Sequence, residues 1–190
     1  PISGIDLASE PVRARIAAAI EASRSMPFAA GPIVAGSVAV PAEVQPVTNP
    51  ANRSETVGGV AEATAADIER ALAAASAAAP DWAAQPAAMR CTRLQTAAEL
   101  FERDADTLIA LAVREAGKSW ANAVAELREA VDFLRYYAQQ ARGFDAASHV
   151  PLGPVLCISP WNFPLAIFTG QVSAALAAGK GRRDLASKLY

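Results

Sequence analysis

Histidine, cysteine and basic charge are scarce in this 190-residue chain, and each shortage argues against a class of function. The one histidine, His149, and the two cysteines, Cys91 and Cys157, suggest neither a zinc site nor a disulfide framework. A formal net charge of −2 provides no basic surface for nucleic acid. No apolar run reaches the length of a membrane span, and the N-terminal residues lack a signal pattern. We therefore expect no metal, no nucleic-acid partner for this segment, no membrane span and a cytoplasmic location.

Apolar residues are abundant, at 53% of the chain, and many of them are alanine. The length suits one domain or part of a larger one. Because alanine buries little area, the helices are expected to depend on close packing. Helical periodicity and end signals predict four helices, with Pro80 ending the second and Asp104 marking a break in the third. These helices are expected over residues 9–20, 64–79, 86–116 and 120–141.

Two short strands are predicted ahead of these helices. Val47–Thr48 and Thr56–Val57 flank the turn cluster Asn49–Arg53. The strands have two interpretations, an edge that pairs with another subunit or an ordinary hairpin. Residues 26–46, before the turn, are interpreted as a loop or docking segment.

The most informative stretch runs from Gly153 to Gly179. Val155–Ile158 is a wholly apolar run, typical of a strand buried on both faces of a parallel sheet. Ser159-Pro160 ends this strand, because proline cannot donate to a ladder. An apolar helix is predicted from Pro164 to Gly179, buried either in a larger protein or beneath the earlier helices. In open α/β sheets, ligands bind where such strands end and helices begin.

Asn162 lies in the predicted turn and has two interpretations. Its amide can stabilise an oxyanion that develops beside the helix N-terminus, where free N–H groups favour negative charge. Alternatively, Asn162 only caps the helix, as asparagine often does. Trp161 likewise either flanks a flat ligand or belongs to the core.

The string Cys157-Ile-Ser-Pro-Trp-Asn-Phe-Pro-Leu-Ala-Ile-Phe-Thr-Gly-Gln171 resembles the aldehyde dehydrogenase superfamily. More narrowly, it is similar to the glutamate-semialdehyde dehydrogenase module of the bifunctional proline utilization A (PutA) proteins, as are Arg114–Lys118 and Arg128–Tyr137. The resemblance runs from about Gly4 to Gly179. It implies an α/β fold, here a helix-rich N-terminal fragment of an aldehyde dehydrogenase with an incomplete Rossmann-like NAD-binding sheet.

The resemblance also implies a domain organisation and a site. Residues 1–46 would be an N-terminal helix and docking loop, 47–179 the N-terminal portion of the NAD-binding domain, and 180–190 a divergent tail. The tail residues Lys180 and Lys188 are not equated with the family's cofactor-binding lysine. In the family, the residues at these positions serve as the oxyanion-hole amide (Asn162), the NAD site (Ile158, Ser159, Pro160, Trp161) and the neighbourhood of the aldehyde tunnel (Glu129, Phe133). From the residues alone, a solvated helix face is the better explanation for Glu129, as for most lone acids on such a helix.

The implied parent enzyme is an NAD-dependent aldehyde dehydrogenase (EC 1.2.1 class) of proline catabolism. Its substrate would be the small-molecule aldehyde L-glutamate γ-semialdehyde (1-pyrroline-5-carboxylate), and it would be a homo-oligomer. FAD is expected only if a separate upstream proline dehydrogenase domain exists. The chain lacks Gly-x-Gly-x-x-Gly, but the family binds NAD without that fingerprint.

A covalent dehydrogenase also needs a thiolate nucleophile, and this chain offers a poor choice. Cys157 lies within the apolar run, where burial makes a thiol inert, and Cys91 lies in a predicted helix without a histidine beside it. In the family, the nucleophilic cysteine and the general-base glutamate come after this segment, so the chain alone is expected to be inactive. Two alternatives stay open: a catalytically dead helical interaction or oligomerisation module, and an aldehyde dehydrogenase of other substrate specificity.

Overall fold

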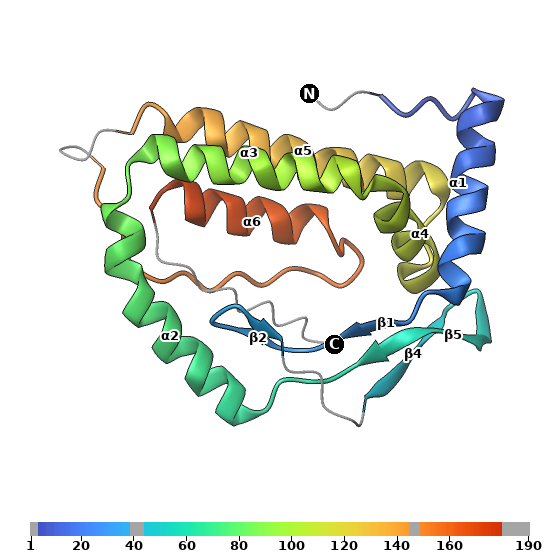
Figure 1. Ribbon diagram of the computed structural model, residues 1–190, viewed down its shortest axis with the longest axis horizontal. Coiled ribbons are helices and arrows are strands. Elements are labelled where there is room, and N and C mark those ends of the chain that lie inside the picture. Colours follow the sequence, from blue (N-terminus) through green and yellow to red (C-terminus); the bar gives the residue numbers. More distant parts are fainter. Residues whose placement is uncertain (1–3, 39–43, 145–148, 180–190) are drawn as a thin grey trace.

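The computed structural model describes residues 4–38, 44–144 and 149–179, and helices dominate it (Figure 1). Helices α3 (Ala87–Arg103), α5 (Trp120–Ala141) and α6 (Ala166–Ala177) pack side by side as one layer. Helices α1 (Glu10–Ala22) and α4 (Ala105–Ala116) pack together at one end of this layer. A short 3-10 helix, η1 (Ser23–Ser25), follows α1, and α2 (Ala65–Ala84) leads from the strands to the opposite end of the layer.

The described strands form one small sheet and one hairpin. In the sheet, β5 (Asn52–Val60) lies between β1 (Phe28–Ala30), which is parallel to it, and β4 (Gln45–Asn49), which is antiparallel. The hairpin consists of β2 (Ile33–Val34) and β3 (Ser37–Val38). The strand pair predicted around Asn49–Arg53 is confirmed and is longer than expected, whereas pairing with another subunit stays a prediction.

The apolar core has two parts, and α5 contributes to both. One part lies between α3, α5 and α6, and the other between α1, α4 and α5. The apolar seam of α5 consists of Val124, Leu127, Val131, Leu134 and Ala138, which are all buried. Much of the remaining core is alanine, so these helices approach closely, as the composition suggested.

The helix ends follow the sequence signals with one exception. Asp104 separates α3 from α4, as predicted, and the predicted start of α2 is confirmed by a capping box between Thr64 and Asp67. Hydrogen bonds from the Thr64 hydroxyl and amide, followed by one from Arg70, lower the pKa of the Asp67 carboxyl to about 2.

The exception is Pro80, which does not end α2, contrary to the prediction. The helix continues to Ala84 and ends before Gln85, whose backbone is extended. Proline removes a single helical hydrogen bond, and the surrounding alanines, strong helix formers, tolerate that loss. Gln85 precedes Pro86, whose ring disfavours the helical conformation at the residue before it. Ile68 of α2 is exposed, because α2 lies at the edge of the molecule.

A buried arginine ties the sheet to the helices. Arg114 of α4 is 2% exposed, and its Nη1 donates to the Ser23 carbonyl (2.7 Å) and hydroxyl (3.1 Å) at the end of α1. Its Nε donates to Glu55 Oε1 of β5 at 2.9 Å. Desolvation raises the pKa of the Glu55 carboxyl, but hydrogen bonds from Asn49, Arg114 and Arg24 outweigh this and hold that pKa below its ordinary value.

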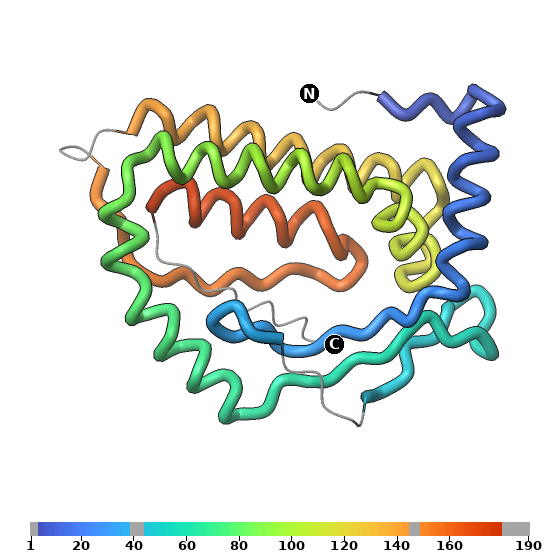
Figure 2. The backbone as a smooth tube through the Cα atoms, in the orientation of Figure 1, coloured from blue at the N-terminus to red at the C-terminus, as the bar shows by residue number. Residues whose placement is uncertain are grey.

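The predicted strand Val155–Ile158 is not formed. The segment is extended and runs beside α6 before the chain turns back into that helix (Figure 2). A hydrogen bond joins this segment to α6: Gln171 Nε2 of the helix donates to the Ile158 carbonyl oxygen at 2.9 Å. A strand exists only through a ladder to a neighbouring strand, and no segment of the described ranges supplies one. The sheet is therefore incomplete, as the resemblance implied.

Helix α6 is covered by the earlier helices, one of the two outcomes expected for it. Every residue from 164 to 179 is buried or half-buried, and α6 packs on α3 and α5. Gly179 follows the helix at φ 75°, which confirms the predicted glycine end. The tail 180–190 lies outside the described residues. Within the described ranges, no helix has the length and apolar character needed to cross a membrane.

Candidate functional site

The turn before α6 contains five of the seven residues expected at the site. Phe163 N donates to the Pro160 carbonyl oxygen at 3.3 Å, which closes the turn. Ile158 and Trp161 are 50% and 62% exposed, and Asn162 is exposed as well. The core interpretation of Trp161 is therefore wrong for the described residues.

Asn162 does not cap α6, so the cap interpretation is also wrong. The N-cap position is Leu165, and no local side chain caps it. Instead, Glu126 Oε1 of α5 accepts hydrogen bonds from Leu165 N (2.8 Å) and Ala166 N (3.3 Å). A carboxylate is favourable at this positive end of the helix dipole. Two amides at this end, those of Leu165 and Ala166, are therefore already occupied.

Lys118 joins this arrangement from the loop between α4 and α5. Its Nζ lies 2.6 Å from Glu126 Oε2 and 4.7 Å from the centre of the Phe163 ring. The side chains of Lys118 and Glu126 are 12% and 2% exposed, so each charge is compensated by the other where little water reaches. Gly117 has a left-handed backbone (φ 65°) that ends α4 and turns the chain towards Lys118.

Side chains from distant elements also bind the other end of α6. Trp82 Nε1 of α2 donates to the Leu176 carbonyl oxygen at 3.1 Å, and Arg90 Nε of α3 donates to the Ala177 carbonyl oxygen at 3.2 Å. Arg90 also donates to the Gln85 carbonyl oxygen. A guanidinium is favourable at the negative end of a helix. Both ends of α6 are therefore fixed by oppositely charged groups that its own segment does not supply.

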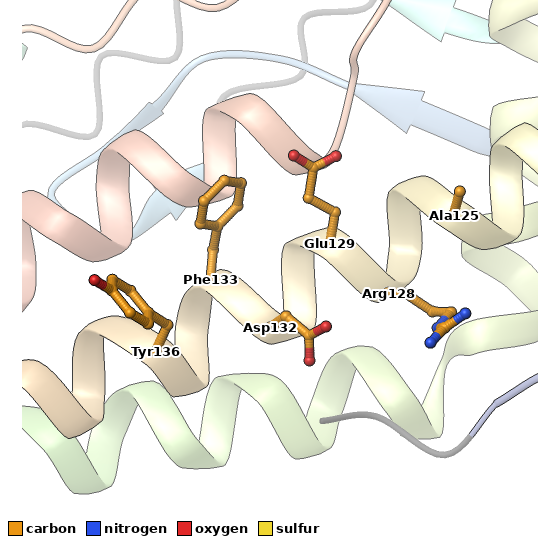
Figure 3. Close-up of a pocket in the computed structure, with 6 residues that line it drawn as sticks. All are labelled: Ala125, Arg128, Glu129, Asp132, Phe133 and Tyr136. Atoms are coloured by element: carbon orange, nitrogen blue, oxygen red, sulfur yellow. The ribbon is translucent and has the colours of Figure 1, made fainter.

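The two expected tunnel residues line one open depression of about 560 Å³ on α5 (Figure 3). Glu129 and Phe133 project from the same side of the helix, whereas Asp132 projects from another. The depression is lined by Ala125, Arg128, Glu129, Asp132, Phe133 and Tyr136. The structure thus brings Glu129 and Phe133 together, with charged neighbours of both signs.

Gly170 of α6 makes room for the Phe133 ring. A Cβ atom at this glycine would lie 2.9 Å from Phe133 Cδ2, closer than van der Waals contact allows. A glycine inside a helix lowers the stability of that helix. The structural reason for Gly170 is the packing of Phe133.

We expect Gly170→Ala to lower the free energy of unfolding, although alanine is the better helix former by about 1 kcal/mol. Overpacking against Phe133 costs about 1–3 kcal/mol, which outweighs this gain. Urea unfolding measures the difference. In a Phe133→Ala background the clash is absent, so the same glycine substitution should become stabilising. A stabilising effect in both backgrounds would contradict this account of Gly170.

Sequence reasoning missed Glu126, Lys118 and Arg90. Lys118 belongs to the segment Arg114–Lys118, which matched the family, but no local pattern pairs it with Glu126. Glu126 lies beside the apolar seam of α5 and not in it, so nothing in the local pattern distinguished it from the other acidic residues of that helix. The two cysteines are both buried, which was the expectation for Cys157. In the described ranges, no group of three or more His, Cys, Asp or Glu residues is arranged to hold a metal.

Comparison with known proteins decides the family. The aldehyde dehydrogenase family matches residues 38–180, well over half of the chain. The chain belongs to this family. The helix-rich fold with partial sheets is accordingly that of an aldehyde dehydrogenase fragment, which confirms the expected fold class.

Relatives and solved structures refine the similarity. The chain is 52% identical over 178 residues to the bifunctional protein PutA of Salmonella typhimurium, covering 93% of this chain and 13% of that protein. It is 40% identical over 162 residues to 1-pyrroline-5-carboxylate dehydrogenase of Anoxybacillus flavithermus, covering 78% and 32%. A Thermus 1-pyrroline-5-carboxylate dehydrogenase with bound NAD has a TM-score of 0.85 at 33% identity, covering 95% and 38%.

A PutA structure from Bdellovibrio bacteriovorus has a TM-score of 0.81 at 30% identity, covering 92% of this chain and 20% of that one. The chain therefore spans about a third of the 1-pyrroline-5-carboxylate dehydrogenases that it matches, and less of the PutA proteins.

Proposed function

We propose that this aldehyde dehydrogenase segment is the N-terminal part of an NAD-dependent enzyme that oxidises L-glutamate γ-semialdehyde to L-glutamate. The similarity to PutA and to 1-pyrroline-5-carboxylate dehydrogenase supports the substrate. The similarity to a Thermus structure with bound NAD supports the cofactor. The segment 47–179 would form the N-terminal portion of the NAD-binding domain in a homo-oligomeric enzyme.

The observation that carries the proposal is that the Asn162 side chain is exposed and does not cap α6. Because Glu126 binds the first amides of α6, the exposed Asn162 side chain is not needed to cap that helix. Its N–H donors are then available to a substrate. An aldehyde oxygen gains negative charge when a nucleophile attacks the carbonyl carbon, and a fixed amide donor stabilises that charge. The anchored helix α6 supplies the rigid support.

The residues before Asn162 fit NAD in chemical character. Ile158 and Trp161 present exposed apolar surface suited to flat rings, and Ser159 offers a hydroxyl to a ribose or phosphate group. When bound, NAD supplies the hydride acceptor of the oxidation. The depression beside Phe133 and Glu129 would border the path of the aldehyde, with the phenyl ring as an apolar wall. FAD would belong only to a separate upstream domain.

The test compares the full-length protein that contains this segment with residues 1–190 alone. NADH formation is followed with L-glutamate γ-semialdehyde, succinate semialdehyde and propanal as substrates. We expect the full-length protein to have its highest kcat/KM with glutamate semialdehyde, and the chain alone to show no turnover. A higher kcat/KM with another aldehyde would contradict the substrate. No turnover with any aldehyde would favour a catalytically dead interaction module.

A further inference from the structure

We infer that the buried Lys118–Glu126 ion pair sets the position of the Asn162 amide. The rate of aldehyde oxidation would then depend on two residues that need not touch the substrate. This inference rests on the proposed function, because it assigns positioning residues to the same site.

The segment that follows Asn162 contacts these two side chains at three points, two of them on its backbone. The Phe163 ring lies 4.7 Å from Lys118 Nζ, and the amides of Leu165 and Ala166 both donate to Glu126 Oε1. Asn162 immediately precedes these anchors, and its side chain does not cap the helix. The anchors on its C-terminal side therefore determine where its amide lies.

The pair itself is rigidly supported. Glu126 is buried on α5, and Lys118 lies between two fixed positions. On one side of Lys118 is Gly117, where a Cβ atom would lie 2.9 Å from the Pro50 ring. On the other side is Ser119, whose hydroxyl accepts from Asn122 N at 3.3 Å and caps α5. Loss of either charge would leave the other buried and uncompensated. A change in either side chain would therefore also disturb the turn that both side chains contact.

The expected consequence is a change in rate rather than in binding. A displacement of about 1 Å in a group that acts on the transition state can cost up to about a hundredfold in rate. Glu126→Ala removes the acceptor for two amides and the partner of Lys118. In the full-length enzyme we expect it to lower kcat about tenfold or more, with kcat/KM reduced in parallel and the dissociation constant of NAD within about twofold.

A double-mutant cycle with Asn162→Ala distinguishes positioning from a general structural role. If Glu126 acts through Asn162, Glu126→Ala should change kcat by less than about twofold once the amide is absent, because nothing remains to be positioned. Glu102→Gln is the matched control, since the Glu102–Arg135 ion pair also ties α5 to a neighbouring helix, α3. We expect this control to leave kcat unchanged in both backgrounds.

The outcomes separate this inference from the proposed function. An unchanged kcat in Glu126→Ala, or the same fold loss with and without Asn162, would overturn the positioning role and leave the proposed function standing. An unchanged kcat in Asn162→Ala would overturn the positioning role together with the oxyanion assignment of Asn162, whereas only a lack of turnover with glutamate semialdehyde in the unmodified enzyme would overturn the proposed function.

Thermal unfolding and sedimentation show whether each variant is folded. If Glu126→Ala does not fold, Glu126→Gln and Lys118→Met enter the same cycle. Glutamine keeps an acceptor for the two amides, and methionine keeps most of the apolar stem of lysine. Each is expected to lower kcat about threefold to tenfold, and only when Asn162 is present. A loss that persists in the Asn162→Ala background would overturn the inference.

Discussion

Replacing Asn162 by alanine in the full-length enzyme is expected to lower kcat about a hundredfold or more, the usual cost of losing one oxyanion donor. The structure sharpens this expectation, because the cap of α6 is provided by Glu126 and survives the substitution. The midpoint of thermal unfolding should therefore stay close to that of the unmodified enzyme. Steady-state NADH formation measures the first quantity and calorimetry the second.

The control for this prediction is Asn122→Ala, which removes an exposed amide at the start of α5 and should leave kcat unaffected. If Asn162→Ala instead lowers the unfolding temperature by several degrees and leaves kcat unchanged, the amide has a structural role, and the oxyanion assignment is wrong.

Replacing Arg114 by methionine is expected to have the largest effect on stability, a loss of about 3–5 kcal/mol in the free energy of unfolding. This is the usual cost of removing one partner from a buried ion pair. The guanidinium joins β5 to the end of α1 through Glu55 and Ser23, and methionine replaces none of these hydrogen bonds. Denaturant unfolding monitored by circular dichroism gives the difference.

Arg103→Met provides the comparison for this second prediction. Arg103 also pairs with a carboxylate, that of Asp104, but both side chains are largely exposed to water. Solvent-screened pairs of this kind contribute little to stability, so its unfolding curve should match that of the unmodified protein. Equal losses for the two arginine variants would show that the burial of Arg114 is not what matters.

The sequence was sufficient for features that depend on neighbours along the chain. The capping box at Thr64, the break at Asp104 and the bounds of α5 all follow from residues within a few positions of each other. Pro80 misled the prediction because a proline inside an alanine-rich helix weakens it without ending it. Local signals therefore predicted most helices and one strand pair.

Features that depend on distant partners were not predictable in this way. The strand expected at Val155–Ile158 needs a neighbouring strand, and its apolar composition says nothing about whether one is present. The amide of Leu165 and its acceptor Glu126 are 39 residues apart, and no local pattern connects them. Asn162 was found through its motif, but the reason that its amide is not used as a cap became visible only in three dimensions.

The way in which α6 is held has a consequence for the order of folding. The helix is apolar on nearly every side and takes its end groups from α2, α3 and α5, so its isolated segment has neither an amphipathic face nor caps. Its partners all precede it in the chain and leave the ribosome first. The turn containing Asn162 would therefore reach its final geometry late, after α2, α3 and α5 have packed together and α6 has docked on them.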